Sequence, residues 1–353
     1  MKIDALEVYP VDQFVYVKIR TDAGLYGLGE ASLSGRSLAV VAALEHLEPV
    51  LVGQDASRIE HIWQDIFRGT FWRGGPVLQS ALAGIDIALW DLAGQRRGTS
   101  VSRLLGGFRK RLPTYASTYH GDHAGGLDSP EAYAAFAQQC RDMGYPAFKI
   151  HGWNKAPVAQ EVATVLAVRE AVGTGMDLMV DPACELTTFG DALKVGRACD
   201  EADFFWYEDP FRDGGISQFA HRKLRQLIRT PLLQTEHVRS LEPHIDFALA
   251  DATDYIRGDI GYDGITGVMK LAHAAESLGM DIEFHGPLPA ARQCMAAIRN
   301  TIYFEIGLVH PNAPASHPDE LYLDHSDRLD SIDERGHVPV SYTHLTLPTS
   351  DLV

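Results

Sequence analysis

The segment that decides the fold is Phe204-Phe205-Trp206-Tyr207-Glu208-Asp209-Pro210. Its four successive aromatic residues predict a strand that is buried on both faces, which is typical of a parallel sheet covered by helices. Two carboxylates and a proline follow directly, so the strand ends where its acidic side chains emerge. Taken alone, Glu208 and Asp209 could equally open a solvated turn, but the functional residues of a parallel barrel lie at the carboxyl ends of its strands.

The same pattern recurs on both sides of this segment. Residues 176–180 form a mostly apolar run that ends at Asp181, and residues 231–235 lead into Glu236. The intervals that separate Glu208 from Asp181 and from Glu236 are 27 and 28 residues. A parallel (β/α)₈ barrel of about 250 residues allots roughly 30 residues to each strand–helix unit. Three consecutive strands are therefore predicted to bring one carboxylate each to the same rim.

These three carboxylates together predict a metal site. Asp181, Glu208 and Glu236 would repel one another at one rim unless a cation lay between them. A ligand set made only of oxygen atoms favours Mg²⁺ over Zn²⁺. The trio is far more specific than any one of its members, and we expect Mg²⁺ to be the cofactor.

Composition limits the partners that the chain can bind. With 46% hydrophobic and 22% charged residues, the chain of 353 residues is typical of a soluble globular protein. Its net charge of −16 argues against nucleic acid or an anionic membrane as a partner. The chain starts without an apolar signal core, no run approaches membrane-spanning length, and the four cysteines form no CxxC pair. We expect a reduced, cytoplasmic enzyme that acts on a small molecule and forms a homo-oligomer.

Residues 1–112 are predicted to form a separate α+β unit. Residues 15–20 alternate as a half-buried strand and a turn leads into a second strand at 25–30, so we expect a meander of three strands. The helical patterns lie at 37–52, 57–68 and 76–97. The last of them is apolar nearly all round and should be buried. The loop at 32–37 is suited to act as a lid, and the loop at 69–75 is either a surface loop or, as we favour, a second flap.

From residue 113 the sequence alternates between strand and helix patterns, which predicts a parallel barrel over residues 113–314. The candidate strands are 113–118, 146–151, 177–181, 204–208, 232–236, 254–259, 281–285 and 302–306. Eight strands in this length indicate a compact barrel with short connections. The first helix carries its own signals, with Ser129 as N-cap, Pro130 in the first turn and Gly144 as terminator.

The remaining strand ends carry further polar groups. Lys149 and His151 alternate at the end of the second strand, and they could form ion pairs, bind an anionic substrate or move protons. The sixth strand ends at Asp259 and the seventh at His285. A lone histidine after an apolar strand is more often a core residue, but an aspartate on the neighbouring strand can hold one tautomer and raise its basicity. Glu305 lies among apolar residues, which predicts a raised pKa and a neutral hydrogen-bond donor.

In order and spacing, these strand-end groups resemble those of the enolase superfamily, specifically its mandelate racemase-like branch and the acid-sugar dehydratases. The set consists of Lys149, His151, Asp181, Glu208, Glu236, Asp259, His285 and Glu305. The resemblance covers the chain from residue 1 to about 340 and includes Gly264-Ile265-Thr266-Gly267. It implies a (β/α)₇β TIM-like barrel, an N-terminal α+β capping domain at 1–112, and a segment at 315–340 that returns to the capping domain.

The resemblance also implies a role for each of these groups in the abstraction of a proton next to a carboxylate. The implied roles are Mg²⁺ ligation for Asp181, Glu208 and Glu236, the general base for His285 with Asp259, neutralisation of the substrate charge for Lys149, and a hydrogen bond to the substrate carboxylate from Glu305. The loops at 32–37 and 69–75 would contact the substrate.

Three departures from the family pattern are visible. The usual second lysine is His151, which puts a racemase with a lysine base and a histidine base in doubt. The asparagine often found two residues after the first metal ligand is Ala183. Residues 341–353 do not continue the family's glycine-rich pattern, and we expect them to be a non-native tail.

The sequence thus predicts a Mg²⁺-dependent lyase, a dehydratase that converts an acid sugar to a 2-keto-3-deoxy acid. His285 can act first as base and then as acid if the elimination is syn. The alternatives are an epimerase or racemase, or a lactone cycloisomerase, with His151 opposite His285. A catalytically silent carboxylate-binding protein is disfavoured because binding alone needs no base. Specificity is expected from the lid and from the loop at 119–123.

Overall fold

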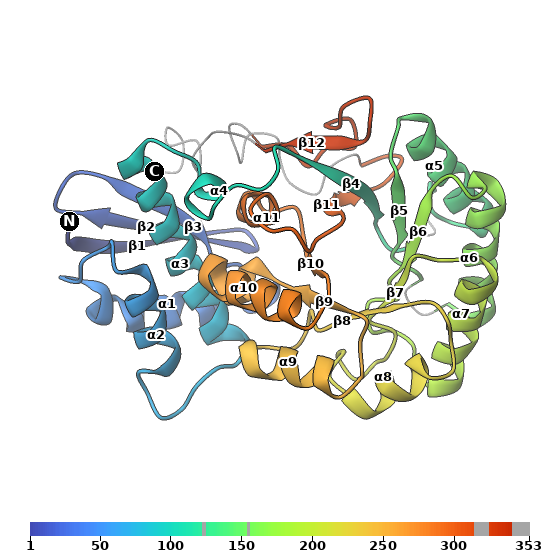
Figure 1. The fold of residues 1–353 in the computed structure, drawn as a ribbon, viewed down its shortest axis with the longest axis horizontal. Coiled ribbons are helices and arrows are strands. Elements are labelled where there is room, and N and C mark those ends of the chain that lie inside the picture. The colour runs from blue at the N-terminus through green and yellow to red at the C-terminus, as the bar shows by residue number, and fades with distance from the viewer. Residues whose placement is uncertain (122–124, 154–155, 314–324, 341–353) are drawn as a thin grey trace.

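The structure, a computed structural model, describes residues 1–121, 125–153, 156–313 and 325–340. An N-terminal α+β unit lies on one side of the molecule and a barrel on the other (Figure 1). This arrangement confirms the predicted fold class, a (β/α)₇β TIM-like barrel with an N-terminal α+β capping domain.

The capping domain is built on an antiparallel meander in the order β1-β2-β3. Its strands are β1 at Ile3–Val11, β2 at Phe14–Thr21 and β3 at Tyr26–Glu30. Its helices are α1 at Ser37–Leu51, α2 at Ile59–Arg68, α3 at Pro76–Arg97 and the short α4 at Val101–Leu104. Buried side chains on alternate positions of β2, such as Val17 and Ile19, share one apolar cluster with Ile85 and Leu89 of α3. The predicted meander and the three long helices are confirmed.

Helix α3 lies between the capping sheet and the barrel. By length and composition its 22 residues could cross a membrane, but 78% of the most apolar window is buried inside the protein. It packs against β3 on one side and against α10 (Ile260–Ser277) on the other. The expectation that no run approaches membrane-spanning length is therefore wrong for this helix. The expectation that it is buried is confirmed, and this packing on two sides accounts for its apolar surface.

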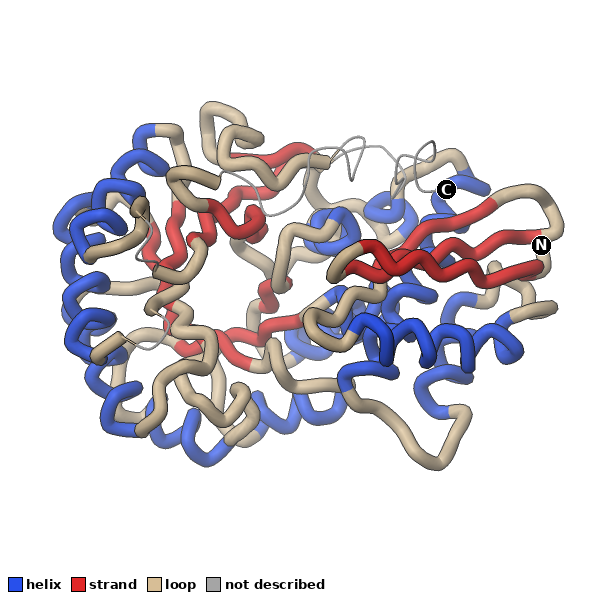
Figure 2. The backbone as a smooth tube through the Cα atoms, turned by 180° about the vertical axis from the view of Figure 1, so that it is seen from behind, coloured by secondary structure: helices blue, strands red, loops and turns tan. Residues whose placement is uncertain are grey.

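The barrel sheet runs in the order β10-β9-β8-β7-β6-β5-β4-β11 with parallel neighbours throughout. The strands are β4 at Arg111–Thr118, β5 at Ala147–Ile150, β6 at Asp177–Val180, β7 at Trp206–Glu208, β8 at Leu232–Gln234, β9 at Tyr255–Gly258, β10 at Ile282–Phe284 and β11 at Phe304–Val309. The end strands β10 and β11 also contact each other, which closes the barrel. Figure 2 shows its strands curving around one axis, away from the capping sheet. Each of the eight predicted strands is present.

Helices join the described strands and cover the outside of the barrel (Figure 1). They are α5 at Pro130–Asp142, α6 at Val158–Val172, α7 at Phe189–Glu201, α8 at Gln218–Arg225, α9 at Leu241–Leu249, α10 at Ile260–Ser277 and α11 at Pro289–Met295. The start predicted for the first of them is confirmed, because Ser129 Oγ accepts a hydrogen bond from Ala132 N at 3.1 Å and Pro130 occupies the first turn.

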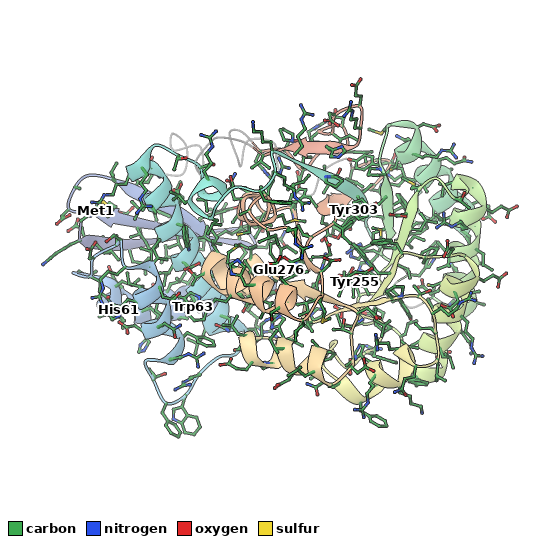
Figure 3. All side chains as sticks on the ribbon, viewed as in Figure 1. Met1, His61, Trp63, Tyr255, Glu276 and Tyr303 are labelled. Carbon is green, nitrogen blue, oxygen red and sulfur yellow. The ribbon has the colours of Figure 1, made fainter. Side chains whose placement is uncertain are left out.

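An aromatic layer fills the barrel at the amino-terminal ends of its strands. The ring of Phe205 lies 5.7 Å from that of Tyr303 and 6.1 Å from that of Tyr255. Figure 3 labels both tyrosines, at the start of β9 and directly before β11. Trp206 of β7 lies edge-on to Tyr115 at 5.6 Å. The aromatic run of the fold-deciding segment therefore seals this end and leaves the other end for polar groups.

The described part of the C-terminal segment packs on the barrel. Strand β12 at His337–Pro339 pairs antiparallel with β4, and Tyr145 donates a hydrogen bond to the carbonyl of Leu329 at 2.7 Å. The sequence predicts that residues 315–340 return to the capping domain; the described residues 338–340 lie beside Lys110, Arg111 and Leu112, at the end of the predicted 1–112 unit, and residues 315–324 lie outside the described part of the chain. The predicted non-native tail at 341–353 lies outside the described residues.

A buried carboxylate joins the capping domain to the barrel. Asp86 of α3 accepts hydrogen bonds from Thr266 N at 2.8 Å and Thr266 Oγ1 at 2.6 Å at the kink of α10. Gly264 forms this kink with φ +66°, and a Cβ there would lie 2.6 Å from a carboxylate oxygen of Asp86. Because α10 directly follows β9, this joint fixes the capping domain over the carboxyl ends of the strands.

Candidate active site and metal centre

The three predicted metal ligands converge at the carboxyl ends of adjacent strands. Glu208 ends β7, while Asp181 and Glu236 directly follow β6 and β8. One carboxylate oxygen from each residue lies within 4.8 Å of the others. Glu208 is fully buried and Asp181 nearly so, whereas Glu236 is partly accessible. The structure therefore brings together the trio that the spacing of the sequence predicted.

Two buried cations lie against this trio. Lys149 Nζ is 3.1 Å from Glu208 Oε2 and 2.9 Å from Glu305 Oε1. Burial alone would lower the pKa of Lys149, but Glu208 and Glu305 hold it well above its usual value. Lys149 is therefore a permanent positive charge and is unsuited to act as a base. Arg257 is equally buried, with Nε 2.9 Å from Glu208 Oε1 and Nη2 2.5 Å from Glu305 Oε2.

The sequence interpretation missed Arg257. The pattern that could have revealed it is the alternation of Tyr255 and Arg257 along β9 with Asp259 directly after the strand. Alternate residues of a strand share one face, so all three are expected on the inward face. The tyrosine joins the aromatic layer and the aspartate reaches the rim, so the arginine lies between them. Arg257 Nη2 also donates to the hydroxyl of Tyr115 at 3.1 Å.

The charge balance of this cluster fits a divalent cation. Its four carboxylates belong to Asp181, Glu208, Glu236 and Glu305, and among the described residues the lysine and arginine side chains that pair with them are Lys149 and Arg257. When all four carboxylates are ionised, an excess of two negative charges remains, which one divalent ion would balance. Burial, followed by the charges of its carboxylate neighbours, raises the pKa of Glu208 to about 8. The donor set is all oxygen, as Mg²⁺ prefers.

The predicted base dyad is formed across β9 and β10. His285 Nδ1 lies 3.0 Å from Asp259 Oδ2, and His285 Nε2 lies 3.5 Å from Glu236 Oε1. Asp259 also caps α10, because Oδ1 accepts a hydrogen bond from Gly261 N at 2.7 Å. Burial opposes charge on the ring, but Glu236 and Asp259 outweigh it and raise the pKa of His285 to about 9. This direction agrees with the raised basicity that the sequence predicts for a histidine beside Asp259.

His151 faces the trio from the side of β5. Its Nε2 lies 3.3 Å from Asp181 Oδ2, and its Nδ1 lies 3.3 Å from Ser117 Oγ. The backbone N–H of His151 donates to Thr118 Oγ1 at 3.0 Å. The ring also lies edge-on to His120, with ring centroids 5.4 Å apart. His151 therefore shares the carboxylate of Asp181 with Lys149.

The expectation that Glu305 is a neutral donor is wrong. Burial alone would raise its pKa, but Lys149 and Arg257 hold the pKa of Glu305 well below its usual range. The ionised carboxylate accepts hydrogen bonds from Ser117 Oγ and Gly286 N, both at 2.8 Å. A carboxylate in this state accepts hydrogen bonds, and Glu305 links Lys149 of β5 to Arg257 of β9.

A cavity of about 460 Å³ opens between the capping domain and the barrel. Ser32 and Ser34 of the predicted lid loop line it, together with His151, His285 and Glu305 of the barrel. The lid loop thus lies over the same space as the base dyad. The cavity is large enough for a small-molecule ligand.

The second predicted flap lies elsewhere. No residue of the loop at 69–75 lines this cavity, and the rings of Phe71 and Trp72 are 86% and 83% exposed. The surface-loop alternative is therefore the one that the structure shows. In the predicted specificity loop at 119–123, Tyr119 lines the cavity, while positions 122 and 123 lie outside the described residues.

Family models match both domains. Residues 5–106 match the mandelate racemase / muconate lactonizing enzyme N-terminal domain, and residues 132–341 match the enolase C-terminal domain-like family. The chain belongs to the enolase superfamily. The resemblance that rested on strand-end residues is thus confirmed over most of the chain.

Three relatives illustrate this membership. A D-mannonate dehydratase from Sphingomonas sp. (strain SKA58) is 32% identical, with 92% of this chain and 84% of the relative covered. The crystal structure of a D-glucarate dehydratase from Agrobacterium tumefaciens complexed with magnesium has a TM-score of 0.85 at 29% identity and covers 98% and 96% of the two chains. A 3,6-anhydro-D-galactonate cycloisomerase from Zobellia galactanivorans has a TM-score of 0.82 at 26% identity and covers 100% and 98%.

Proposed function

We propose that this protein is an acid-sugar dehydratase that uses Mg²⁺ to remove the proton next to a carboxylate and then releases the β-hydroxyl group as water, giving a 2-keto-3-deoxy acid. The observation that carries the proposal is the His285–Asp259 pair, which borders both the cavity and the carboxylate trio. The dehydratase names of the mannonate and glucarate relatives support the choice of substrate class.

Asp181, Glu208 and Glu236 would hold the Mg²⁺ ion. When bound, the ion supplies a positive charge that stabilises the negative charge that develops on a substrate carboxylate during proton removal. Lys149 Nζ, 3.1 Å from Glu208 and 3.5 Å from Asp181, adds a second positive charge, since its pKa is held well above the usual value. Arg257 holds Glu208 and Glu305 in place.

Proton transfer is assigned to His285. Nε2 faces the rim while Nδ1 is held by Asp259 Oδ2, so the carboxylate fixes the tautomer in which Nε2 can accept the α-proton. The imidazolium then returns that proton to the departing β-hydroxide on the same face. The net change is loss of one water molecule, and the resulting enol becomes the keto acid by protonation at C3.

Solvent exchange tests the assignment of the base. We expect His285→Asn to abolish exchange of the substrate α-proton with deuterium and to lower turnover by at least about 10³-fold. Asp259→Asn should weaken exchange because the tautomer is no longer held. His61→Asn is the matched control, since His61 lies 3.3 Å from Asp65 in a similar pair on the surface. Full exchange in the His285 variant would overturn the proposal.

A second candidate function is an epimerase or cycloisomerase that uses His151 as a second base. It is favoured by the presence of His151 and His285 in one cavity and by the cycloisomerase among the similar structures. The two candidates differ in the His285→Asn variant, in which a second base would still exchange the proton of one epimer. We expect none, and His151→Gln should only slow turnover, because an amide replaces the imidazole beside Asp181. A panel of acid sugars assayed for 2-keto acid formation identifies the substrate.

A further inference from the structure

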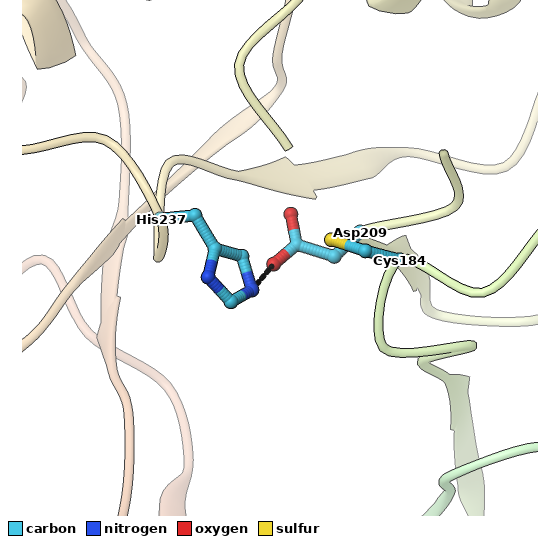
Figure 4. A group of neighbouring side chains, drawn as sticks. All are labelled: Cys184, Asp209 and His237. Atoms are coloured by element: carbon cyan, nitrogen blue, oxygen red, sulfur yellow. Dashed lines mark ion pairs between the residues drawn. The ribbon is translucent and has the colours of Figure 1, made fainter. Parts of the chain in front are cut away.

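A second group of ligand-type side chains follows the three predicted Mg²⁺ ligands along the chain. Asp209 and His237 directly follow Glu208 and Glu236, and Cys184 lies three residues after the first ligand of the trio. The ligand atoms of Cys184, Asp209 and His237 all lie within 4.8 Å of one another. Figure 4 shows the imidazole of His237 pointing at the carboxylate of Asp209, with the sulfur of Cys184 beside it. Nothing in the proposed dehydration uses these residues.

Local backbone geometry brings the group together. Cys184 and Asp209 both have positive φ, +62° and +33°, and Cys184 N donates to the carbonyl of Asp209 at 2.7 Å. This hydrogen bond ties the turn after β6 to the turn after β7. His237 approaches from the turn after β8, so three turns supply one side chain each.

The carboxylate at the centre of the group is poorly satisfied. Asp209 is only 1% exposed, and within the described part of the chain Oδ1 has no hydrogen-bond or ion-pair partner, while Oδ2 is paired only with His237. Its one close contact is with His237 Nε2, 3.2 Å from Oδ2. Gly215 leaves open the space beside Oδ1, because a Cβ there would lie 2.9 Å from that oxygen. His237 compensates Oδ2, but the buried Oδ1 still requires a donor or a cation.

We propose that Cys184, Asp209 and His237 form a second metal site, selective for a transition-metal ion such as Zn²⁺. Sulfur, imidazole nitrogen and carboxylate oxygen are the ligands that Zn²⁺ prefers, whereas Mg²⁺ takes oxygen ligands. A thiolate and a carboxylate with a neutral imidazole balance the charge of a divalent ion. The side chain of His237 is 40% exposed, which leaves a fourth position open to water or a ligand.

The two metal sites share a border. Glu236 Oε1 lies 3.9 Å from His237 Nε2, and Asp209 is bonded directly to Glu208 along the chain. A metal ion in the second site would therefore fasten the turns that carry the Mg²⁺ ligands. Differences in ligand softness separate the two sites, so each selects a different kind of ion.

Cobalt binding tests the site without any assay of activity. The protein is stripped with EDTA, saturated with Mg²⁺ to fill the carboxylate trio, and titrated with Co²⁺. We expect one Co²⁺ per chain with the charge-transfer absorption of a thiolate ligand, and Zn²⁺ should displace it. Cys184→Ser and Asp209→Asn should each abolish this band and weaken binding by at least about 100-fold. Cys140→Ala, at a buried cysteine on α5, is the matched control and should keep the band.

Two further variants make the outcome decisive. Glu208→Gln should keep the thiolate band, so failure of the Mg²⁺ site and failure of the second site are distinguishable. If Cys184→Ser does not fold, the rate at which Cys184 is alkylated is measured instead. Zn²⁺ should protect this thiol from alkylation in the wild-type protein but not in His237→Asn. Cobalt binding without a thiolate band, or equal alkylation with and without Zn²⁺, would overturn the proposal.

Discussion

Two glutamates in the barrel interior have the same pKa shift but different surroundings. Glu208 at the carboxyl end of β7 and Glu283 of β10 are both fully buried, and burial is the largest cause that raises the pKa of each to about 8. Glu208 faces two cations, Lys149 and Arg257, at 3.1 and 2.9 Å. Glu283 instead accepts hydrogen bonds from the backbone N–H groups of residues 302–303 at 2.7 and 3.1 Å.

The difference shows that the partners of a buried carboxylate, and not its pKa, indicate its function. A charged side chain beside a carboxylate can move aside when a metal ion or a substrate binds there, because the backbone does not hold its charged group in one place. Backbone N–H groups are fixed, so the carboxylate that they hold contributes to the packing of the barrel. Function at the carboxyl ends of the strands and stability at the other end are the division of roles expected of parallel barrels.

The same substitution at both glutamates tests this division most strongly. Glu208→Gln should lower turnover by about 10³-fold or more and weaken Mg²⁺ binding, because a neutral amide replaces a metal ligand. Glu283→Gln should leave kcat/KM within about threefold of wild type, since its partners lie away from the cavity. Steady-state kinetics and Mg²⁺ titration measure both. An equal loss of activity in the two variants would contradict the comparison.

A third buried carboxylate, Asp86, resembles Glu283 in its surroundings, because it accepts hydrogen bonds from a backbone N–H and a hydroxyl group and not from a charged side chain. Gly264→Ala should destabilise this joint by about 3 kcal/mol, since the new Cβ combines a positive φ with a clash against Asp86. Gly279→Ala is the control, because it has φ +74° with open space around the Cβ and should cost only about 1 kcal/mol. Urea unfolding gives both values, and equal values would show that the joint does not depend on this contact.

The pH dependence of stability tests how Glu283 is held. Its folded pKa of about 8 lies above the unfolded value, so the folded state binds the proton more tightly. Wild type should therefore lose stability relative to Glu283→Gln as the pH rises from about 4.5 to 8, by up to about 1.4 kcal/mol per pH unit. Urea unfolding of both proteins at several pH values measures this difference. A difference that does not change with pH would show that Glu283 is already ionised in the folded protein.

The smallest effect is expected at the loop at 69–75. Phe71→Ser should change the free energy of unfolding by less than about 0.5 kcal/mol and leave kcat/KM unchanged, because the ring is exposed and lies outside the cavity. Ser34→Phe, in the loop that does line the cavity, is the contrasting variant and should raise KM. A raised KM in the Phe71 variant would restore the flap interpretation.

The sequence by itself determined the barrel, the capping domain and the positions of the site residues. Side chains alternate with a period of two along a strand, and parallel strands end at one rim. Carboxylates that follow the apolar runs of consecutive strands are therefore neighbours at that rim. Asp181, Glu208, Glu236 and the Asp259–His285 pair followed from this rule. Arg257 obeys the same alternation and could have been found in the same way.

Only the tertiary structure decided the protonation states and the neighbours of these residues. The ionisation of Glu305 depends on Lys149 and Arg257, which lie on two other strands, and burial had predicted the opposite shift. The second ligand group of Cys184, Asp209 and His237 likewise depends on three turns that meet in space. A charge interacts with every neighbour around it, whatever its position in the chain, whereas a sequence pattern records only neighbours along the chain.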